Sequence, residues 1–199
     1  MDTTPVVLEG KHVRLEPLTE EHFSALAKIA FDADLWRWST WPRMQTEEDL
    51  RDYIQAALKL QRAGNCLPWV TREKSSGRVV GSTRFSDIQP AQGTLELGGT
   101  WLIRECQGTG LNVEAKYLQL QHALETMGAR RVALKTHHQN LRSQAAMRAM
   151  GAKEEGTFRN HMIMPDGSVR HSVWFSVIRE EWPETKAHLE RRMAKFFRE

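Results

Sequence analysis

Cysteine is scarce in this 199-residue chain, which contains only two, and neither lies in a metal-ligand spacing. A disulfide framework and a cysteine-based metal site are therefore not expected. Long hydrophobic runs are also missing, so no segment approaches the length of a membrane span. The first residues have neither the basic region nor the apolar core of a signal peptide. We therefore expect a cytoplasmic protein that binds no membrane and needs no metal.

The chain also has no strong excess of one charge, with 28 basic and 25 acidic residues and a net charge of +3. Such a charge helps to attract an anionic ligand, but no nucleic-acid recognition motif accompanies it. A nucleic-acid-binding module is therefore the weakest of the functions considered. The length and the 40% hydrophobic content allow one sizeable core. Because no linker or repeat interrupts the pattern, we predict a single domain over residues 1–199.

Hydrophobic patterns predict a succession of strands and helices. Strands are expected at residues 13–18, 67–72, 78–86, 93–103, 131–135, 157–164 and 169–178. Helices are expected after Thr19 and Thr46, which are favoured N-cap residues, and at residues 113–127, 143–150 and 180–198. Asp49, three residues after Thr46, completes a pattern that resembles a capping box. The turn sequences at 74–77 and 165–168 predict two hairpins.

The segment from Gln107 to Asn112 lies between a predicted strand and a predicted helix and contains two glycines. Such a loop lets backbone N–H groups approach an anion, with the positive end of the helix dipole behind them. The expected ligand is a phosphate or pyrophosphate. A P-loop is excluded because leucine, not lysine, follows Gly110, and a dinucleotide fingerprint lacks its third glycine at Val113. The alternative interpretation is a plain glycine-rich turn.

The remaining pattern, Gln-x-x-Gly-x-Asn, resembles the pyrophosphate loop of the GNAT superfamily of acyl-CoA N-acyltransferases. That loop reads Gln/Arg-x-x-Gly-x-Gly/Ala, so Asn112 is a departure, although asparagine tolerates unusual backbone angles. The resemblance runs from about residue 11 to about residue 182. It is nearest to the ribosomal-protein N-acetyltransferase branch, whose members are RimJ-like or RimL-like. The segments that carry it are 13–18, 81–85, 95–102, 107–112, 140–143 and 150–152.

The resemblance implies an α/β (α+β) fold in which a mixed, mostly antiparallel sheet is flanked by helices. It also implies acetyl-CoA as co-substrate, with the pantetheine arm held between two strands that part from each other. Backbone groups of residues 101–103 would pair with that arm as another strand would. The residues expected to contact the cofactor are Trp101, Leu102, Ile103, Gln107, Gly108, Thr109, Gly110, Leu111, Asn112, Asn140 and Ser143.

Glu96 is the candidate general base. Leucines flank it on both sides, so strand alternation directs Glu96 to the opposite face. The attacking amine must lose a proton, which a carboxylate accepts directly or through water, and the resemblance implies an acidic residue here. The alternative is a solvent-facing or salt-bridged glutamate, and Asp87 is a weaker rival for the role. Other groups that titrate near neutrality are His137, His138 and His161.

Asn140 and Ser143 match the Asn-x-x-Ser signature that the resemblance implies. Asn140 would then bond the pantetheine amides, and Ser143 would donate to the departing thiolate. The alternative interpretation is an N-cap pair, since both residue types favour helix starts.

The acceptor pocket is expected beneath the connection between the first two helices, which the resemblance places above the acceptor. That connection supplies Trp36, Trp38 and Trp41, while Glu96 would face the acceptor from the sheet. The alternative is that these tryptophans are core residues. The acceptor is expected to be a primary amine, either a protein N-terminus or a small molecule. The sequence does not decide between a monomer and a homodimer.

These expectations together predict an N-acetyltransferase in which the amine attacks the thioester of acetyl-CoA directly. Two alternatives stay open. A non-catalytic acyl-CoA-binding sensor would keep the loop without the chemistry. An N-acyltransferase that uses a longer acyl-CoA would keep everything except a tight acyl pocket.

Overall fold

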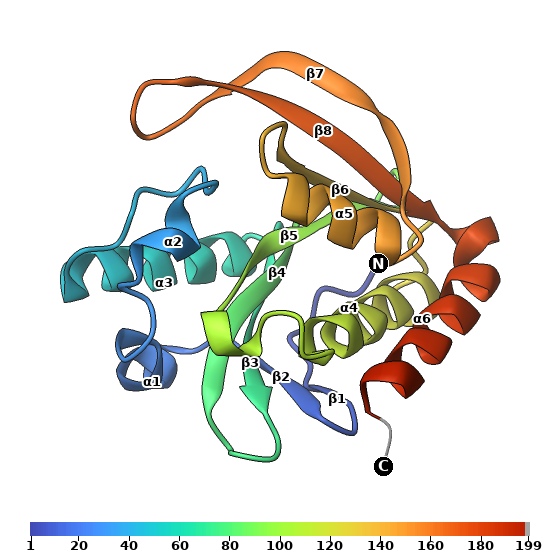
Figure 1. Cartoon of the computed structure of the whole chain (residues 1–199), viewed down its shortest axis with the longest axis horizontal. Helices are drawn as coiled ribbons and strands as arrows, with labels where there is room; N and C mark the ends of the chain where they lie inside the picture. Colours follow the sequence, from blue (N-terminus) through green and yellow to red (C-terminus); the bar gives the residue numbers. More distant parts are fainter. Residues whose placement is uncertain (198–199) are drawn as a thin grey trace.

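The computed structural model describes residues 1–197, and its centre is one eight-stranded sheet (Figure 1). The strands lie in the order β1-β2-β3-β4-β5-β6-β8-β7. They are β1 (Leu8–Glu9), β2 (Val13–Pro17), β3 (Leu67–Glu73), β4 (Val79–Gln89), β5 (Thr94–Leu102), β6 (Arg131–His137), β7 (Lys153–Ile163) and β8 (Val169–Ile178). Neighbouring strands are antiparallel except β5 and β6, which are parallel. The expected mixed, mostly antiparallel sheet is therefore confirmed.

Helices flank this sheet and pack into two hydrophobic clusters. They are α1 (Phe23–Ala27), α2 (Ala33–Trp36), α3 (Glu47–Arg62), α4 (Leu111–Gln121), α5 (Leu141–Ala149) and α6 (Trp182–Phe196). In Figure 1, α1 to α3 lie on one side of the sheet, with α4 and α6 on the other. Along β5, Leu95 and Leu97 are buried with the α4 cluster, whereas Trp101 is buried with the α3 cluster. The two faces of β5 therefore meet different helix layers.

Local sequence signals explain where the longest helices begin and end. The Thr46 hydroxyl accepts a hydrogen bond from the Asp49 N–H at 3.2 Å, and the Asp49 carboxylate accepts one from the Thr46 N–H at 2.8 Å. This reciprocal pair satisfies two N–H groups that the first helical turn leaves free, and the capping box is confirmed. Gly64, with φ of +74°, takes the left-handed conformation just after α3 ends.

A buried carboxylate ties α4 to the start of the sheet. Glu114 accepts hydrogen bonds from the backbone N–H groups of Lys11, His12 and Val13 at 2.8, 2.9 and 2.7 Å. A Cβ atom on Gly10 would lie 2.6 Å from the carboxyl carbon of Glu114, so the turn before β2 has room only for glycine. The helix that follows the glycine-bearing loop is therefore held rigidly against β1 and β2.

The structure differs from the predicted elements mainly at their ends. Helix α4 begins at Leu111 rather than at residue 113, and α5 begins at Leu141 rather than at residue 143. After α4 the chain continues as a wider π-helical turn over His122–Thr126. β1 and α2 were not predicted, because each is too short for periodicity to reveal. The predicted C-terminal helix ends at Phe196 in the structure, and residue 198 lies outside the described part of the chain.

The two central strands part shortly after they meet. β5 and β6 are paired only over three positions, which end at Glu96 and Ala133. Beyond them β5 continues to Leu102 without β6 beside it, while β6 goes on paired with β8. A bulge interrupts the pairing of β5 with β4, and Gly99 takes a φ of +56° there. The sheet therefore opens between β5 and β6, toward the end at which the glycine-bearing loop begins.

Residues 1–197 contain neither a candidate membrane span nor a candidate metal site. No helix combines the length and the apolar content that a bilayer crossing requires. No group of three or more histidine, cysteine, aspartate or glutamate side chains is arranged to hold a metal ion.

Candidate functional site

The glycine-bearing loop presents five consecutive backbone N–H groups. Within residues 1–197, those of residues 108–112 have no hydrogen-bond partner, whereas the next two, at Val113 and Glu114, already bond to the carbonyl oxygen of Gly110. The five free groups belong to the loop and to the first two residues of α4, where the helix dipole is positive. This arrangement suits an anion with several oxygen atoms, such as a pyrophosphate.

The two glycines of the loop have different surroundings. Gly110 is the N-cap of α4 with φ of +93°, and an added Cβ would lie 2.6 Å from the Cβ of Phe196 in α6. Gly108 also has a positive φ, of +79°, but an added Cβ would meet nothing within 4 Å. Substitution of Gly110 therefore perturbs the packing of α6, whereas substitution of Gly108 perturbs the loop alone.

A cavity of about 350 Å³ adjoins the first residue of this loop. Its lining residues are Asp32, Asp34, Leu35, Arg37, Trp38, Arg104, Gln107, Gln139, Asn140, Leu141 and Arg142. The guanidinium of Arg142 donates a hydrogen bond to the side-chain oxygen of Gln107. The cavity thus joins predicted site residues from the loop, the start of α5 and the α2 region. Its three arginines add positive charge beside the free N–H groups.

The backbone groups of Leu102, the last residue of β5, and of Ile103, which follows it, point in different directions. The N–H of Ile103 bonds to the carbonyl of Val80 at 2.9 Å, and its carbonyl accepts from the N–H of Cys106. Because backbone groups alternate sides along a strand, those of Leu102 face away from β4, toward the opening. The Leu102 carbonyl accepts a hydrogen bond there from the Gln107 side chain at 2.7 Å. Trp101 is buried, and its indole N–H lies 3.3 Å from the Tyr53 hydroxyl.

Glu96 lies where β5 and β6 part, and only 9% of its surface is exposed. Its Oε2 atom forms an ion pair with the ammonium of Lys135 on β6. The Lys135 ammonium also lies 4.9 Å from the ring centre of Trp174 on β8. An added Cβ on Gly98 would lie 3.1 Å from Oε1 of Glu96, so glycine leaves space beside this second oxygen. The predicted alternative of a salt-bridged glutamate is thus present, with one carboxylate oxygen outside the ion pair.

A second polar group lies on the same face, on β7 and β8. Ser172 is fully buried, and its hydroxyl bonds to Nδ1 of His161 at 2.9 Å and accepts from Nε of Arg170 at 2.9 Å. Burial lowers the pKa of His161, and the charges of Lys135 and Arg170 lower it further. His161 is therefore neutral at neutral pH.

Asp87 and His137, two other candidates for the general base, lie in places less suited to that role than Glu96. Asp87 is exposed, has φ of +47° and accepts a hydrogen bond from Gln89. His137 is buried, and burial together with the nearby His138 lowers the pKa of its imidazole. Its Nδ1 accepts a hydrogen bond from the Gln139 N–H at 3.0 Å, and its ring lies 4.8 Å from that of Trp38.

Asn140 and Ser143 form the N-cap pair of α5. The Asn140 side chain accepts a hydrogen bond from the Ser143 N–H at 3.2 Å. Asn140 also lines the cavity beside the loop, so capping and ligand contact are compatible there. The Ser143 side chain is partly buried, and the structure gives its hydroxyl no hydrogen bond to residues 1–197.

The three predicted acceptor-pocket tryptophans have different surroundings. Trp36 is buried, donates to the carbonyl of Ala30 at 2.6 Å, and packs against Tyr53 and Trp101. Trp41 also packs edge-on against Tyr53. Trp38 alone lines the cavity. Trp36 and Trp41 therefore build the core layer, and Trp38 brings an aromatic ring to the site.

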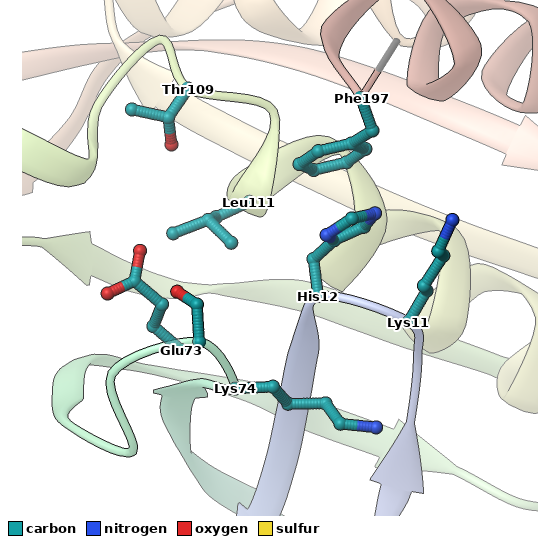
Figure 2. Close-up of a pocket in the computed structure, with 8 residues that line it drawn as sticks. Lys11, His12, Glu73, Lys74, Thr109, Leu111 and Phe197 are labelled. Carbon is teal, nitrogen blue, oxygen red and sulfur yellow. The ribbon is translucent and has the colours of Figure 1, made fainter. Parts of the chain in front are cut away.

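A separate cavity of about 360 Å³ lies beside Thr109 and Leu111, against the C-terminal end of α6 (Figure 2). The ring of Phe197 stacks on that of His12 at a centroid distance of 3.7 Å. Lys74 is already engaged here, because its ammonium bonds to Glu9 at 2.8 Å and to the Gly10 carbonyl. Its charge is thus compensated, and the cavity shares only the loop with the site described above.

Sequence reasoning missed the basic partners of the site. Lys135 and Arg170 belong to predicted strands, but nothing local indicates that they meet Glu96 and Ser172. Arg142 lies inside the predicted Asn-x-x-Ser motif and Arg104 lies three residues before the loop, so the sequence did show a basic residue within or near each motif.

The chain is similar to one family model and to several solved structures. A family model described as an acetyltransferase (GNAT) domain matches residues 12–153. A solved structure of a candidate acetyltransferase from T. thermophilus is 38% identical, with a TM-score of 0.87 over 96% of this chain and 99% of that chain. A GCN5-related N-acetyltransferase from Brucella melitensis is 28% identical, with a TM-score of 0.85 over 95% of this chain and 86% of that one.

A more distant structure, Mycobacterium smegmatis RimJ in complex with CoA-disulfide, is 20% identical. Its TM-score is 0.83 over 96% of this chain and 95% of that one, and at this identity the likeness concerns the fold alone. No curated protein gives a significant match.

Proposed function

The chain belongs to the GNAT family of acetyltransferases, and from that membership we propose that it transfers the acetyl group of acetyl-CoA to a primary amine by direct attack. The observation that carries the proposal is the run of five free N–H groups at residues 108–112, at the end of a sheet that opens between β5 and β6. A pyrophosphate and an extended arm would fit these two features together.

The residues that would hold acetyl-CoA come from three parts of the chain. The N–H groups of residues 108–112 would bind the pyrophosphate, and Arg104 and Arg142 would compensate its charge. The backbone carbonyl of Leu102 would pair with the pantetheine arm, once the Gln107 side chain releases it. Asn140 would contact the arm from the start of α5.

Acetyl-CoA would supply an activated thioester, and this chain would supply orientation and proton transfer. The Leu102 N–H faces the opening and would polarise the thioester carbonyl. The amine nitrogen forms the new bond to the acetyl carbon, the carbon–sulfur bond breaks, and Oε1 of Glu96 takes the amine proton directly or through water. We assign to Ser143 the proton that the departing thiolate takes up.

Lys135 would keep Glu96 in place for this role. Its ammonium binds one carboxylate oxygen and leaves the other beside the space that Gly98 provides. A buried carboxylate with one free oxygen at the parting of the strands favours an enzyme over a non-catalytic sensor.

The finer identity of the acceptor and of the acyl donor stays a prediction. A protein N-terminus would agree with the predicted resemblance to the RimJ/RimL-like branch, which itself stays a prediction because the RimJ structure is only 20% identical. The preference for acetyl over a longer acyl chain, the homodimer and the cytoplasmic location likewise stay predictions.

The loop is tested by a matched pair of variants at Gly108, where a side chain meets no neighbour. Asparagine and aspartate both tolerate the left-handed conformation and differ mainly in charge. We expect Gly108→Asp to weaken CoA binding about tenfold more than Gly108→Asn, which corresponds to ~1.4 kcal/mol, because a carboxylate would repel the phosphates. Isothermal titration of both variants with CoA measures this difference. Equal affinities would place the phosphates elsewhere.

A further inference from the structure

Arg170 is a buried residue whose guanidinium has no carboxylate partner in the part of the chain that the structure describes. Only 5% of its surface is exposed, and it lies on β8 just beyond the last residue paired with β6. Its Nε donates to the Ser172 hydroxyl at 2.9 Å. Its two terminal nitrogens form no hydrogen bond or ion pair within residues 1–197. Neither is among the fully buried side-chain atoms that lack a partner, so both are open to the solvent side of the site. Arginine stays protonated in proteins, so this group offers a positive charge and free N–H donors to an anion that enters the site.

The surrounding groups do not provide that anion. Within residues 1–197, the carboxylate that acts on Arg170 electrostatically is that of Glu96, which is already paired with Lys135. His161 and His137 have lowered pKa values and are neutral at neutral pH. The nearby face therefore carries two cations and one anion, an excess of one positive charge.

A further unsatisfied donor lies on the same strand. The indole N–H of Trp174 is buried and has no hydrogen-bond partner within residues 1–197. Trp174 is directly opposite Lys135 in the β6–β8 register. Trp174 lies four positions after Arg170 on the strand, so their side chains share one face of the sheet. That face offers hydrogen-bond donors in excess of acceptors.

The distance between Arg170 and the Glu96–Lys135 pair indicates how long an acceptor that contacts both must be. Arg170 precedes Trp174 by four residues on β8, which corresponds to roughly 13 Å of strand at about 3.3 Å per residue. The long side chains of arginine, lysine and glutamate span much of this distance. A small molecule, or the first residues of a peptide, would therefore reach both groups at once.

From these observations we propose that the amine acceptor carries a carboxylate, which Arg170 binds while the amine lies beside Glu96. The inference rests on the proposed acetyl transfer and adds the class of acceptor. The carboxylate belongs either to a free amino acid or to an acidic residue at the start of a peptide. In both cases Arg170 would bind it through two parallel hydrogen bonds, as guanidinium and carboxylate groups pair elsewhere.

The first test uses the wild-type protein and matched acceptors. Free amino acids, including aspartate and glutamate, are compared with their amides and with the corresponding decarboxylated amines. Peptides that begin with an acidic residue are compared with peptides in which glutamine or asparagine replaces it. Acetyl-CoA is present throughout, and free thiol is measured. We expect kcat/KM for the best carboxylate-bearing acceptor to exceed that of its neutral match by about 30-fold or more, as for a buried charge pair.

The second test changes Arg170. In Arg170→Met the preference for the carboxylate should fall toward unity, mainly through a higher KM, and Arg170→Lys should restore it in part. Arg191→Met, which removes an exposed arginine from α6, is the matched control and should keep the full preference. A purely structural role for Arg170 predicts that all acceptors lose activity equally.

The outcomes separate this inference from the proposed function. If neutral or cationic amines are acetylated as well as carboxylate-bearing ones, the inference is wrong and acetyl transfer stands. If no amine of any class releases thiol although acetyl-CoA binds, acetyl transfer itself is wrong. If Arg170→Met fails to fold, the comparison of acceptors with wild-type protein still tests the inference, because it needs no variant.

Discussion

Lys116 on α4 provides a stability prediction whose size follows from the structure. Its side chain is 7% exposed, and its ammonium donates to Thr83, Thr100 and Gln119 at 2.8, 2.6 and 2.9 Å. None of these partners is a carboxylate, so burial lowers the pKa of Lys116 from 10.5 to about 7. The difference corresponds to roughly 5 kcal/mol of stability that the protonated amine costs.

The sign of the pH effect follows from proton binding. Between pH 7 and pH 10.5 the unfolded chain holds a proton on Lys116 that the folded protein has released, so the free energy of unfolding rises with pH in this window. Lys116→Met removes the penalty but also removes three hydrogen bonds worth about 1 kcal/mol each. The hydroxyls of Thr83 and Thr100 still bond to each other at 2.8 Å. We therefore expect the variant to be about 2 kcal/mol more stable than wild type at pH 6.

The assay is urea denaturation of both proteins at pH 6, 8 and 9.5, with Lys59→Met on the exposed face of α3 as control. The stability gain of Lys116→Met should shrink and then reverse as the pH rises, while the control difference stays constant. A variant that is less stable than wild type at pH 6, or whose difference does not change with pH, would refute the reasoning.

Two further predictions concern the buried carboxylates of Glu96 and Glu114. Glu96→Gln should leave acetyl-CoA affinity unchanged and lower turnover by about 10²–10⁴-fold at pH 7. The loss should be smaller at high pH, because the amine is already deprotonated there. Full activity of the variant at pH 7 would show that Glu96 is not the base. Glu114→Ala leaves three backbone N–H groups of residues 11–13 without a partner, so it should lower the free energy of unfolding by about 3 kcal/mol or more and Tm by roughly 6–12 °C. An unchanged melting curve by circular dichroism would contradict the role given to Glu114.

The features of the fold that depend on neighbouring residues could be predicted from the sequence. The alternation of β5, the capping box at Thr46 and the strand-to-helix turn at the loop each involve residues a few positions apart. The boundaries were less accurate, since α4 begins at Leu111 through the left-handed Gly110 and not through a side-chain cap. Periodicity alone gives no signal for such a start.

The features that depend on distant residues could not be predicted in this way. Lys135 meets Glu96 because β6 lies parallel to β5, and β8, not β7, comes next in the sheet. That order is a property of the whole topology, so local sequence patterns could not predict the partners of Glu96 and Arg170. The burial of Trp36 has the same cause, because the helix that carries it is one turn long and is placed by its packing against Tyr53.

The central claim is the transfer of an acetyl group to an amine, and the most direct test is amine-dependent release of free thiol from acetyl-CoA, with the acetylated amine identified by mass spectrometry. The panel contains peptides with different N-termini, amino acids and polyamines, each with wild type and Glu96→Gln. We predict thiol release that requires both the amine and wild-type protein, together with an equal amount of acetylated amine. Tight binding of acetyl-CoA without thiol release from any amine would contradict the account and favour a non-catalytic sensor.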